Sequence, residues 1–340
     1  MTTRAIGLIA AGFYFALSAT IFSGEVRADP VDIRASRIPL YPDRPGDNRA
    51  GSLVYRGGLI LNSSDPRFGG WSDLAVSSDG NRFLALSDRG HWLRARLSYD
   101  ASGNLSNTDA GDITPILDMD GQPVSGRNSD PEGLALERDG DLDGPVVVSF
   151  EGNVRIWRYD FSAGPAARPT NIAIGDWVKR LHNNQQLEAI TILRPDALIA
   201  FGEAKVAPGD DLLGAIESYP GDGQPHTRML SVVPHDPFNI TSAAHAPDGG
   251  LFLLERRFSL MGGGGTELRH IGANDIREGA RLDGEILMNL SLQDANIDNM
   301  EGVAVRRGAH GETLLYLISD DNFLSIQRTL LLMFELRAAN

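Results

Sequence analysis

The sequence predicts an all-β fold, a β-propeller of about five blades with four strands in each blade. Three observations predict it: a weak repeat recurs at a nearly constant spacing, each repeat holds about four short strand-like stretches, and long amphipathic helices are not evident. A constant period of this size is typical of stacked structural units, and four short strands are the content of one propeller blade.

Each repeat opens on an acidic or polar residue, continues into a short alternating strand and a turn, and then forms an apolar strand that ends in an acid. The anchors of successive repeats are separated by 59, 56, 54 and 59 residues. Asp-Gly pairs lie between the two strands in three repeats, where tight turns favour them. The anchors are residues Asp73, Glu132, Glu188, Ser242 and Glu301.

The two ends of the predicted domain indicate how the ring closes. The fifth repeat ends with its third strand, at 329–336, and lacks a fourth, while the stretch 53–61 before the first repeat is a spare strand. Pairing the two would close the ring and cover the last open sheet edge. A sixth blade, built from residues 29–62 with irregular strands, is the alternative.

The N-terminus has the organisation of a signal peptide. Arg4 precedes an uncharged apolar run at 5–22, and a short polar stretch then ends at the small residue Ala28. We therefore assign 1–28 to a signal peptide, 29–52 to an N-terminal extension and 53–340 to a single propeller domain. An uncleaved membrane anchor is the alternative reading of the apolar run. The expected mature protein is a periplasmic or secreted monomer.

Composition limits the partners of the mature chain. No later stretch approaches the roughly 18 apolar residues that a spanning helix needs, so we expect no membrane contact after cleavage. The chain has no cysteine, which leaves an ordinary hydrophobic core to hold an exported protein together. Its formal charge of −14 makes nucleic acid an improbable partner and favours the binding of cations.

Antiparallel pairing would gather the repeated acids at one end of the ring. The start of the first strand lies beside the end of the second in a hairpin, so Glu132 should neighbour Glu151. Because the first strands line the channel, about nine carboxylates would share one rim. Such carboxylates must hold protons or share a cation, and oxygen ligands without cysteine favour Ca²⁺, or else Mg²⁺. The expected metal ligands are Asp73, Asp88, Glu151, Glu203, Glu255 and Asp320. In the alternative, each acid only accepts backbone N–H bonds in a loop.

Basic residues follow the second strands and lie among these acids. Arg89, Lys205 and Arg256 could bind a small anionic ester together with a cation, since a guanidinium can donate hydrogen bonds to phosphate oxygens while the cation neutralises another oxygen. Pairing of these bases with neighbouring carboxylates is the equally weighted alternative. The acids that open the first strands, with one histidine, are the expected acid–base groups. These expected catalytic residues are Glu132, Glu188, Glu301 and His91.

Familiar catalytic signatures are missing from the sequence. It contains no Gly-x-Ser-x-Gly, His-Glu-x-x-His, P-loop or Gly-x-Gly-x-x-Gly pattern. The sequence therefore lacks the motifs by which a serine hydrolase, a zinc protease or a nucleotide-binding protein is usually recognised.

Four short motifs resemble one known family. They are Ser129-Asp130-Pro131-Glu132-Gly133, Asn184-Gln185-Gln186-Leu187-Glu188-Ala189, Glu255-Arg256-Arg257-Phe258, and Asn299-Met300-Glu301-Gly302 with Ser319-Asp320-Asp321-Asn322. The chain resembles, over roughly 53–336, the bacterial proteins with the phytase-like domain described as esterase-like activity of phytase. The resemblance implies phosphodiester or phosphoester hydrolysis by Glu and Asp. The histidine acid phosphatase signature Arg-His-Gly-x-Arg-x-Pro is absent, so such chemistry here would be metal-based.

Two classes of function follow from these observations. The first is an exported, metal-dependent hydrolase of phosphoester or phosphodiester bonds that acts at the acidic rim; a lactonase-type propeller is a related possibility. The second is a non-enzymatic binding or scaffold propeller in which calcium only stiffens the rim. The fold by itself does not decide between them.

Overall fold

The computed structural model describes residues 28–181, 187–220, 224–259 and 263–337. The predicted leader therefore lies outside the described residues, apart from Ala28. In the described part of the chain the regular structure is almost entirely β, and no helix there has the length and apolar character needed to cross a membrane. The helical elements are short 3-10 turns: η1 (Gly126–Asn128), η2 (Phe161–Ala163), η3 (Asp176–Arg180) and η4 (Ala273–Asp275).

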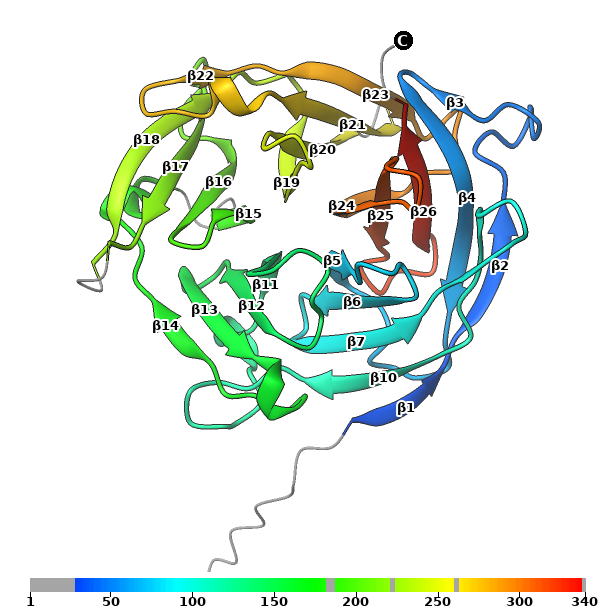
Figure 1. Cartoon of the computed structure of the whole chain (residues 1–340), viewed down its shortest axis with the longest axis horizontal. Coiled ribbons are helices and arrows are strands. Elements are labelled where there is room, and N and C mark those ends of the chain that lie inside the picture. Colours follow the sequence, from blue (N-terminus) through cyan, green and yellow to red (C-terminus); the bar gives the residue numbers. More distant parts are fainter. Residues whose placement is uncertain (1–27, 182–186, 221–223, 260–262, 338–340) are drawn as a thin grey trace, which may run out of the picture.

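Five sheets surround a central channel, and each contributes its first strand to the channel wall (Figure 1). The prediction of five blades is confirmed. The inner strands are β5 (Trp71–Val76), β11 (Pro131–Leu136), β15 (Leu187–Arg194), β19 (Asn239–His245) and β24 (Asn299–Arg307).

Within each blade the chain runs outward through antiparallel strands. The first blade continues with β6 (Arg82–Ser87), β7 (His91–Arg96) and β10 (Ala110–Pro115), and the second with β12 (Pro145–Phe150), β13 (Arg155–Asp160) and β14 (Thr170–Ile172). The third continues with β16 (Ala197–Lys205), β17 (Leu212–Ser218) and β18 (His226–Val232), and the fourth with β20 (Leu251–Ser259), β21 (Gly263–Ile271) and β23 (Glu285–Ser291). A short strand, β22 (Arg281–Leu282), joins the third blade in parallel to β18, and β8 (Ser98–Tyr99) pairs with β9 (Leu105–Asn107).

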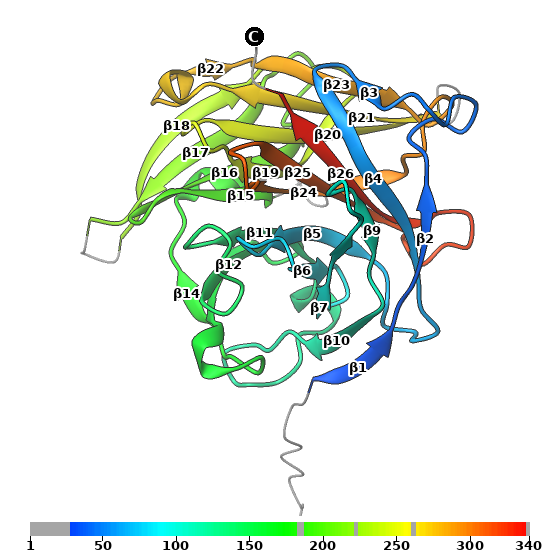
Figure 2. The ribbon, with the colours of Figure 1, turned by 45° about the vertical axis from the view of Figure 1, so that its right-hand side comes forward.

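The fifth blade combines both ends of the domain. After β25 (Thr313–Asp320) and β26 (Thr329–Leu336) comes β4 (Leu53–Asn62), which pairs with β26 from Thr329 opposite Leu61 to Leu336 opposite Leu53. Figure 2 shows β4 beside β26. The predicted pairing of 53–61 with 329–336 is therefore present, and ring closure by this strand is our interpretation of it.

The N-terminal extension adds outer strands instead of a sixth blade. Strand β2 (Arg34–Ile38) and the two-residue β3 (Arg49–Ala50) pair with β4, whereas β1 (Asp29–Asp32) pairs with β10 of the first blade. The alternative of a sixth blade in residues 29–62 is wrong, because these strands extend two existing sheets.

Apolar clusters between neighbouring blades hold the ring together. Each of five buried clusters joins two adjacent blades, including the first with the fifth. The period of two in a strand explains how one sheet serves two clusters. In β25, Tyr316 and Ile318 pack toward the first blade while Leu315 and Leu317 pack toward the fourth. Strands buried on both faces therefore appear in the sequence as continuous apolar runs.

Candidate functional site

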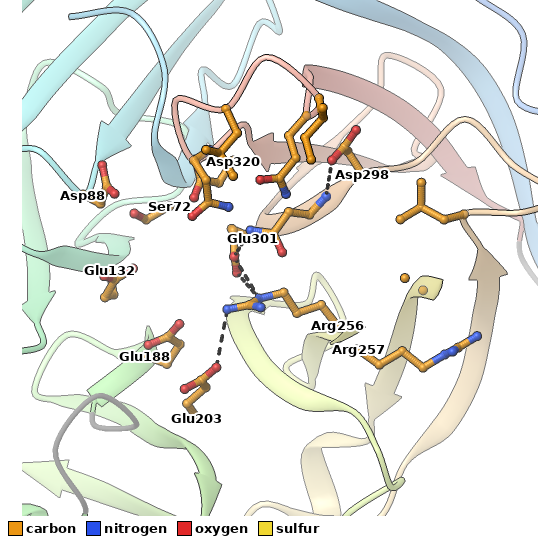
Figure 3. A pocket seen from close by; sticks show the side chains of 18 of the residues that line it. Ser72, Asp88, Glu132, Glu188, Glu203, Arg256, Arg257, Asp298, Glu301 and Asp320 are labelled. Carbon is orange, nitrogen blue, oxygen red and sulfur yellow. Dashed lines mark hydrogen bonds and ion pairs between the residues drawn. The ribbon is translucent and has the colours of Figure 1, made fainter. Parts of the chain in front are cut away.

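One end of the channel opens into a cavity of about 690 Å³, which we call the acidic mouth. The walls come from the starts of the inner strands, the ends of the second strands and the loops that follow them (Figure 3). Seven of the nine carboxylates that the sequence places at one rim line it: Asp88, Glu132, Glu151, Glu188, Glu203, Glu301 and Asp320.

A β-bulge at the start of each inner strand sets which side chain faces the acidic mouth. The register of β11, β15 and β24 shifts between Pro131 and Leu134, between Leu187 and Ala189, and between Met300 and Gly302, and each of these intervals contains a glutamate that lines the cavity. The extra residue of a bulge re-aims a side chain that a regular strand would turn away. The three glutamates are Glu132, Glu188 and Glu301.

Arg256 lies in the middle of the carboxylates, between residues of two other blades (Figure 3). Its Nε is 2.8 Å from Glu301 Oε1, and its Nη2 is 3.5 Å from Glu203 Oε1. Attraction by Glu301 raises the pKa of Arg256 further, so the guanidinium stays charged. Arg256 is therefore a fixed positive centre in a cavity that is otherwise strongly acidic.

The carboxyl groups of the acidic mouth bind protons unusually tightly. Burial, followed by repulsion from Glu203, raises the pKa of Glu188 well above its ordinary value, and burial with repulsion from Glu188 does the same for Glu132. Burial, partly opposed by Arg256, raises the pKa of Glu301 to about 7. Shifts of this kind in a cavity are typical of acid–base groups and of sites that hold a cation.

Asp88 and Asp320 form a second crowded pair in the same cavity. Burial, together with repulsion from Asp320, raises the pKa of Asp88 to about 7. Burial also raises the pKa of Asp320, to about 6. Both acids therefore change charge near neutral pH.

Two groups of oxygens in this region are close enough to share one cation. The carboxylates of Asp130, Glu132 and Glu151 offer oxygens within 4.8 Å of one another, and so do those of Glu151, Glu188 and Glu203. Carboxylate oxygens are the ligands of Ca²⁺ and Mg²⁺, so the donor chemistry of both groups fits a hard cation. Glu151 belongs to both groups and lies between them.

Sequence reasoning passed over Asp130, although it belongs to one of the motifs discussed above. Its φ of +75° is rare for a residue with a side chain, and the same holds for Asn322 (φ +47°) and Phe323 (φ +52°) beside the cavity. Strained backbone of this kind concentrates at functional sites. No spacing rule signals a positive φ at an aspartate, which explains the omission. Asp298 and Asn299 also line the acidic mouth, and the sequence analysis gave neither of them a chemical role.

Asp73 is a correction to the predicted set of metal ligands. The bulge in β5 falls at Ser72, so Ser72 faces the acidic mouth and Asp73 points the other way, into the ring. There Asp73 is buried and accepts hydrogen bonds from Leu134 N (2.8 Å) and Ser242 Oγ (3.0 Å). A Cβ at Gly302 would lie 2.7 Å from Asp73 Cα, so a neighbouring blade leaves room for it. Asp73 therefore links blades across the channel.

We expect Asp73→Ala to destabilise the fold and leave cation binding intact. The change leaves the buried N–H groups of Leu74 and Leu134 and the hydroxyl of Ser242 without an acceptor. Each unsatisfied buried donor costs about 1–3 kcal/mol. Urea denaturation should show a loss of at least about 2 kcal/mol. A stable variant that no longer responds to Ca²⁺ would return Asp73 to the ligand set.

Glu255 is a second correction. The alternation of β20 turns it away from the acidic mouth, and its two carboxylate oxygens lie 2.5 and 2.6 Å from Arg269 Nε and Nη2. Neither side chain has any exposed surface. Because this salt bridge uses both oxygens, Glu255 has a structural role in the fourth blade.

Three other predicted residues also lie outside the lining of the acidic mouth. The guanidinium carbon of Arg89 stacks 3.3 Å from the centre of the Phe323 ring, and Lys205 forms an ion pair with Asp236. His91 begins β7, where its half-buried ring lies near Arg67 and burial lowers its pKa. Arg89 lies in the loop between β6 and β7, whereas His91 begins β7 and Lys205 ends β16.

One group of possible ligands lies away from the acidic mouth. Oxygen and nitrogen atoms of His235, Glu255 and Glu267 also fall within 4.8 Å of one another. Arg269 already neutralises Glu255, while Glu267 accepts from Asn289 (2.6 Å) and contacts His235 Nδ1 (2.5 Å). The histidine lacks a recognisable ligand spacing in the sequence, which is why the pattern gave no signal there.

A five-bladed propeller with an acidic cavity at one channel mouth is the class of protein that the fold and the site define. The chain belongs to the Phytase-like family, described as esterase-like activity of phytase, whose model matches residues 66–323. Membership of this family suggests a hydrolase.

Comparison with solved structures and with curated proteins adds little to this assignment. The crystal structure of the RRP9 WD40 repeats matches with 9% sequence identity and a TM-score of 0.40, covering 92% of this chain and 100% of that chain. Among curated proteins, no match was found.

Proposed function

We propose that the protein is an exported, cation-dependent hydrolase of phosphoester or phosphodiester bonds, with its active site in the acidic mouth. The single observation that carries the proposal is the convergence of Glu132, Glu188 and Glu301 from three blades around Arg256 in one cavity. The family match supports hydrolysis of an ester bond.

Hydrolysis forms a bond from a water oxygen to phosphorus and breaks the bond to the leaving oxygen. An ionised carboxylate of the acidic mouth can take the proton of the attacking water, and a protonated carboxyl group can protonate the leaving oxygen. A carboxyl group with a raised pKa can give a proton to a leaving oxygen, and Glu188 has the burial and the neighbouring charges for that role. Arg256 can neutralise charge that develops on the oxygens of the bound ester. Its carboxylate partners hold the guanidinium in position before substrate arrives.

Asp130, Glu132 and Glu151 are the residues that would hold a cation while Glu188 keeps its proton, with Ca²⁺ as the first choice and Mg²⁺ as the second. A bound Ca²⁺ would offset the repulsion among these carboxylates and act as a Lewis acid toward the ester. The carboxylates themselves must release protons to bind it, so the acidic mouth couples cation binding to pH.

The direct test is turnover of bis(4-nitrophenyl) phosphate and 4-nitrophenyl phosphate in Ca²⁺ and in excess EGTA. We expect release of 4-nitrophenol in Ca²⁺ and its loss in chelator. If neither ester is cleaved under any cation condition, while Ca²⁺ still binds, the non-enzymatic binding function replaces this proposal.

Stability should depend on pH in a way that Ca²⁺ reverses. Without a cation, Glu301 and Asp88 bind protons more tightly in the folded chain than in the unfolded one. Their contribution is therefore full below about pH 4 and is lost as the pH rises through their folded pKa values of about 7. Burial raises the pKa of the candidate ligand Glu132 as well, so protons compete less with Ca²⁺ at pH 8 than at pH 5. Ca²⁺ at a hundredfold excess over Kd should then add about 2.7 kcal/mol.

Melting curves at pH 5 and pH 8, with Ca²⁺ or with EGTA, measure this coupling. The shift on adding Ca²⁺ should be larger at pH 8. An equal shift at both pH values, or none at either, contradicts cation binding by the carboxylates of the acidic mouth.

A further inference from the structure

The acidic mouth has an apolar side that hydrolysis of a purely polar ester does not use. Five large hydrophobic side chains are exposed in the described residues, and three of them line this one cavity. Single exposed hydrophobic residues are ordinary, but a group of them beside a polar site marks a binding surface. We call Leu292, Leu324 and Ile326 the apolar edge.

The three side chains of the apolar edge are largely open to solvent. Leu292 is 38% exposed, Leu324 is 52% exposed and Ile326 is 86% exposed. A ligand with an apolar part would cover this surface and remove it from water, which favours binding.

Leu292 is held against glycines of the fourth blade. Its backbone N–H donates to Gly264 O (3.0 Å), and a side chain at position 264 would collide with the leucine. At Gly265, a Cβ would lie 2.7 Å from Arg257 Nε. The absence of side chains at these two positions therefore makes space for Leu292 and Arg257 at the cavity wall. In Figure 3, Arg257 lies on the side away from Glu132 and Glu188.

Leu324 and Ile326 lie on the loop 321–328, which is fixed at both ends. Phe323 stacks under Arg89 of the first blade at one end. At the other end, Arg328 donates to Asp298 Oδ2 (3.2 Å) and to Ile297 O (2.9 Å). A loop anchored on two blades presents its apolar side chains in a defined place.

We propose, on the basis of the function proposed above, that the substrate is an amphiphilic ester. Its ester group lies among the carboxylates with Arg256, and its alkyl or aryl group covers the apolar edge. The cavity, at about 690 Å³, has room for both parts. A polyphosphate such as myo-inositol hexakisphosphate has no apolar surface to cover Leu324 or Ile326, and it adds negative charge to a strongly acidic cavity.

Paired substrates that differ only in chain length test this proposal. Methyl 4-nitrophenyl phosphate and butyl 4-nitrophenyl phosphate are compared in Ca²⁺, below the concentration at which either aggregates. Full burial of one CH₂ is worth about 0.8 kcal/mol, and about half of that on an open surface, or roughly twofold for each CH₂. We therefore expect kcat/KM to be about tenfold higher for the butyl ester.

The apolar edge is tested by the double variant Leu324→Ser with Ile326→Ser. Both positions are exposed, so the fold should tolerate the change, and the ratio of butyl to methyl kcat/KM should fall to near 1. Met119→Ser is the matched control, because Met119 is 55% exposed but lies outside the cavity lining. Its ratio should equal that of the parent protein.

Failure of this proposal is distinguishable from failure of the proposed function. Hydrolysis of both esters at equal efficiency, or a preference for myo-inositol hexakisphosphate, overturns the amphiphilic substrate while hydrolysis stands. If neither ester is cleaved, calorimetry compares the binding of methyl phosphate and butyl phosphate. Tighter binding of butyl phosphate that is lost in the double variant retains the apolar edge as a ligand site. Equal binding of the two phosphates overturns it.

The same variants distinguish a ligand from a membrane. Binding to phosphatidylcholine vesicles that is lost in the double variant, without any dependence on the substrate chain, would assign the apolar edge to a lipid surface and overturn the proposal.

Discussion

Glu188→Gln is expected to lower kcat for phosphodiester hydrolysis by about 10²-fold or more, which is the usual contribution of a positioned acid–base group. Glutamine keeps the size and much of the hydrogen bonding of the side chain but cannot release or accept the proton. The same change at Glu132 and Glu301 should have effects of similar size, because each lines the acidic mouth close to Arg256 or to a candidate cation site.

The fold should survive these substitutions. Burial and repulsion raise the pKa of Glu188, so the folded state already favours a neutral group there. The melting temperature of Glu188→Gln should therefore equal or exceed that of the parent protein at pH 8 in EGTA.

Asp139→Asn is the control for all three glutamate variants. Asp139 is an exposed acid in the turn after β11 and lies outside the lining of the acidic mouth. Its activity and Ca²⁺ response should match those of the parent protein. If all three glutamate variants also match the parent in activity and cation binding, the acidic mouth has only an architectural role.

Glu255→Gln is expected to destabilise the protein by about 3–5 kcal/mol, because it breaks a fully buried ion pair and leaves one charge behind. Arg269 would keep its hydrogen bonds to Val233 O (3.0 Å) and Asp283 O (2.8 Å) but lose its buried counter-charge. Urea denaturation measures the loss as a lower midpoint at an unchanged slope.

The double change Glu255→Leu with Arg269→Met separates charge from packing. Replacing both members of a buried pair by apolar residues of similar volume is often neutral or stabilising, so stability should return toward that of the parent protein. The shift of melting temperature by Ca²⁺ should persist in Glu255→Gln. A small loss of stability combined with a lost Ca²⁺ response would instead make Glu255 a cation ligand, as the sequence pattern suggested.

Sequence periodicity favoured the architecture that the structure has. A unit of about four short strands that recurs at a nearly constant spacing is typical of a propeller blade, and five anchors favoured five blades, but only the structure excluded a sixth blade in residues 29–62. The same repeat placed seven acids at one end of the channel, since the antiparallel ladder joins the start of one strand to the end of the next. No contact beyond the hairpin is needed for either inference.

Tertiary structure decided which of the repeated acids line the acidic mouth. A shift of one residue moves a side chain to the opposite face of a strand, so the bulge at Ser72 sends Asp73 into the ring while the bulges of β11, β15 and β24 turn glutamates into the acidic mouth. Glu255 follows an apolar run in the sequence like the other acids, but Arg269 on the neighbouring strand neutralises it. Both outcomes depend on side-chain partners and strand registers that form only in the folded chain. A short acidic motif does not indicate which charge will lie opposite it.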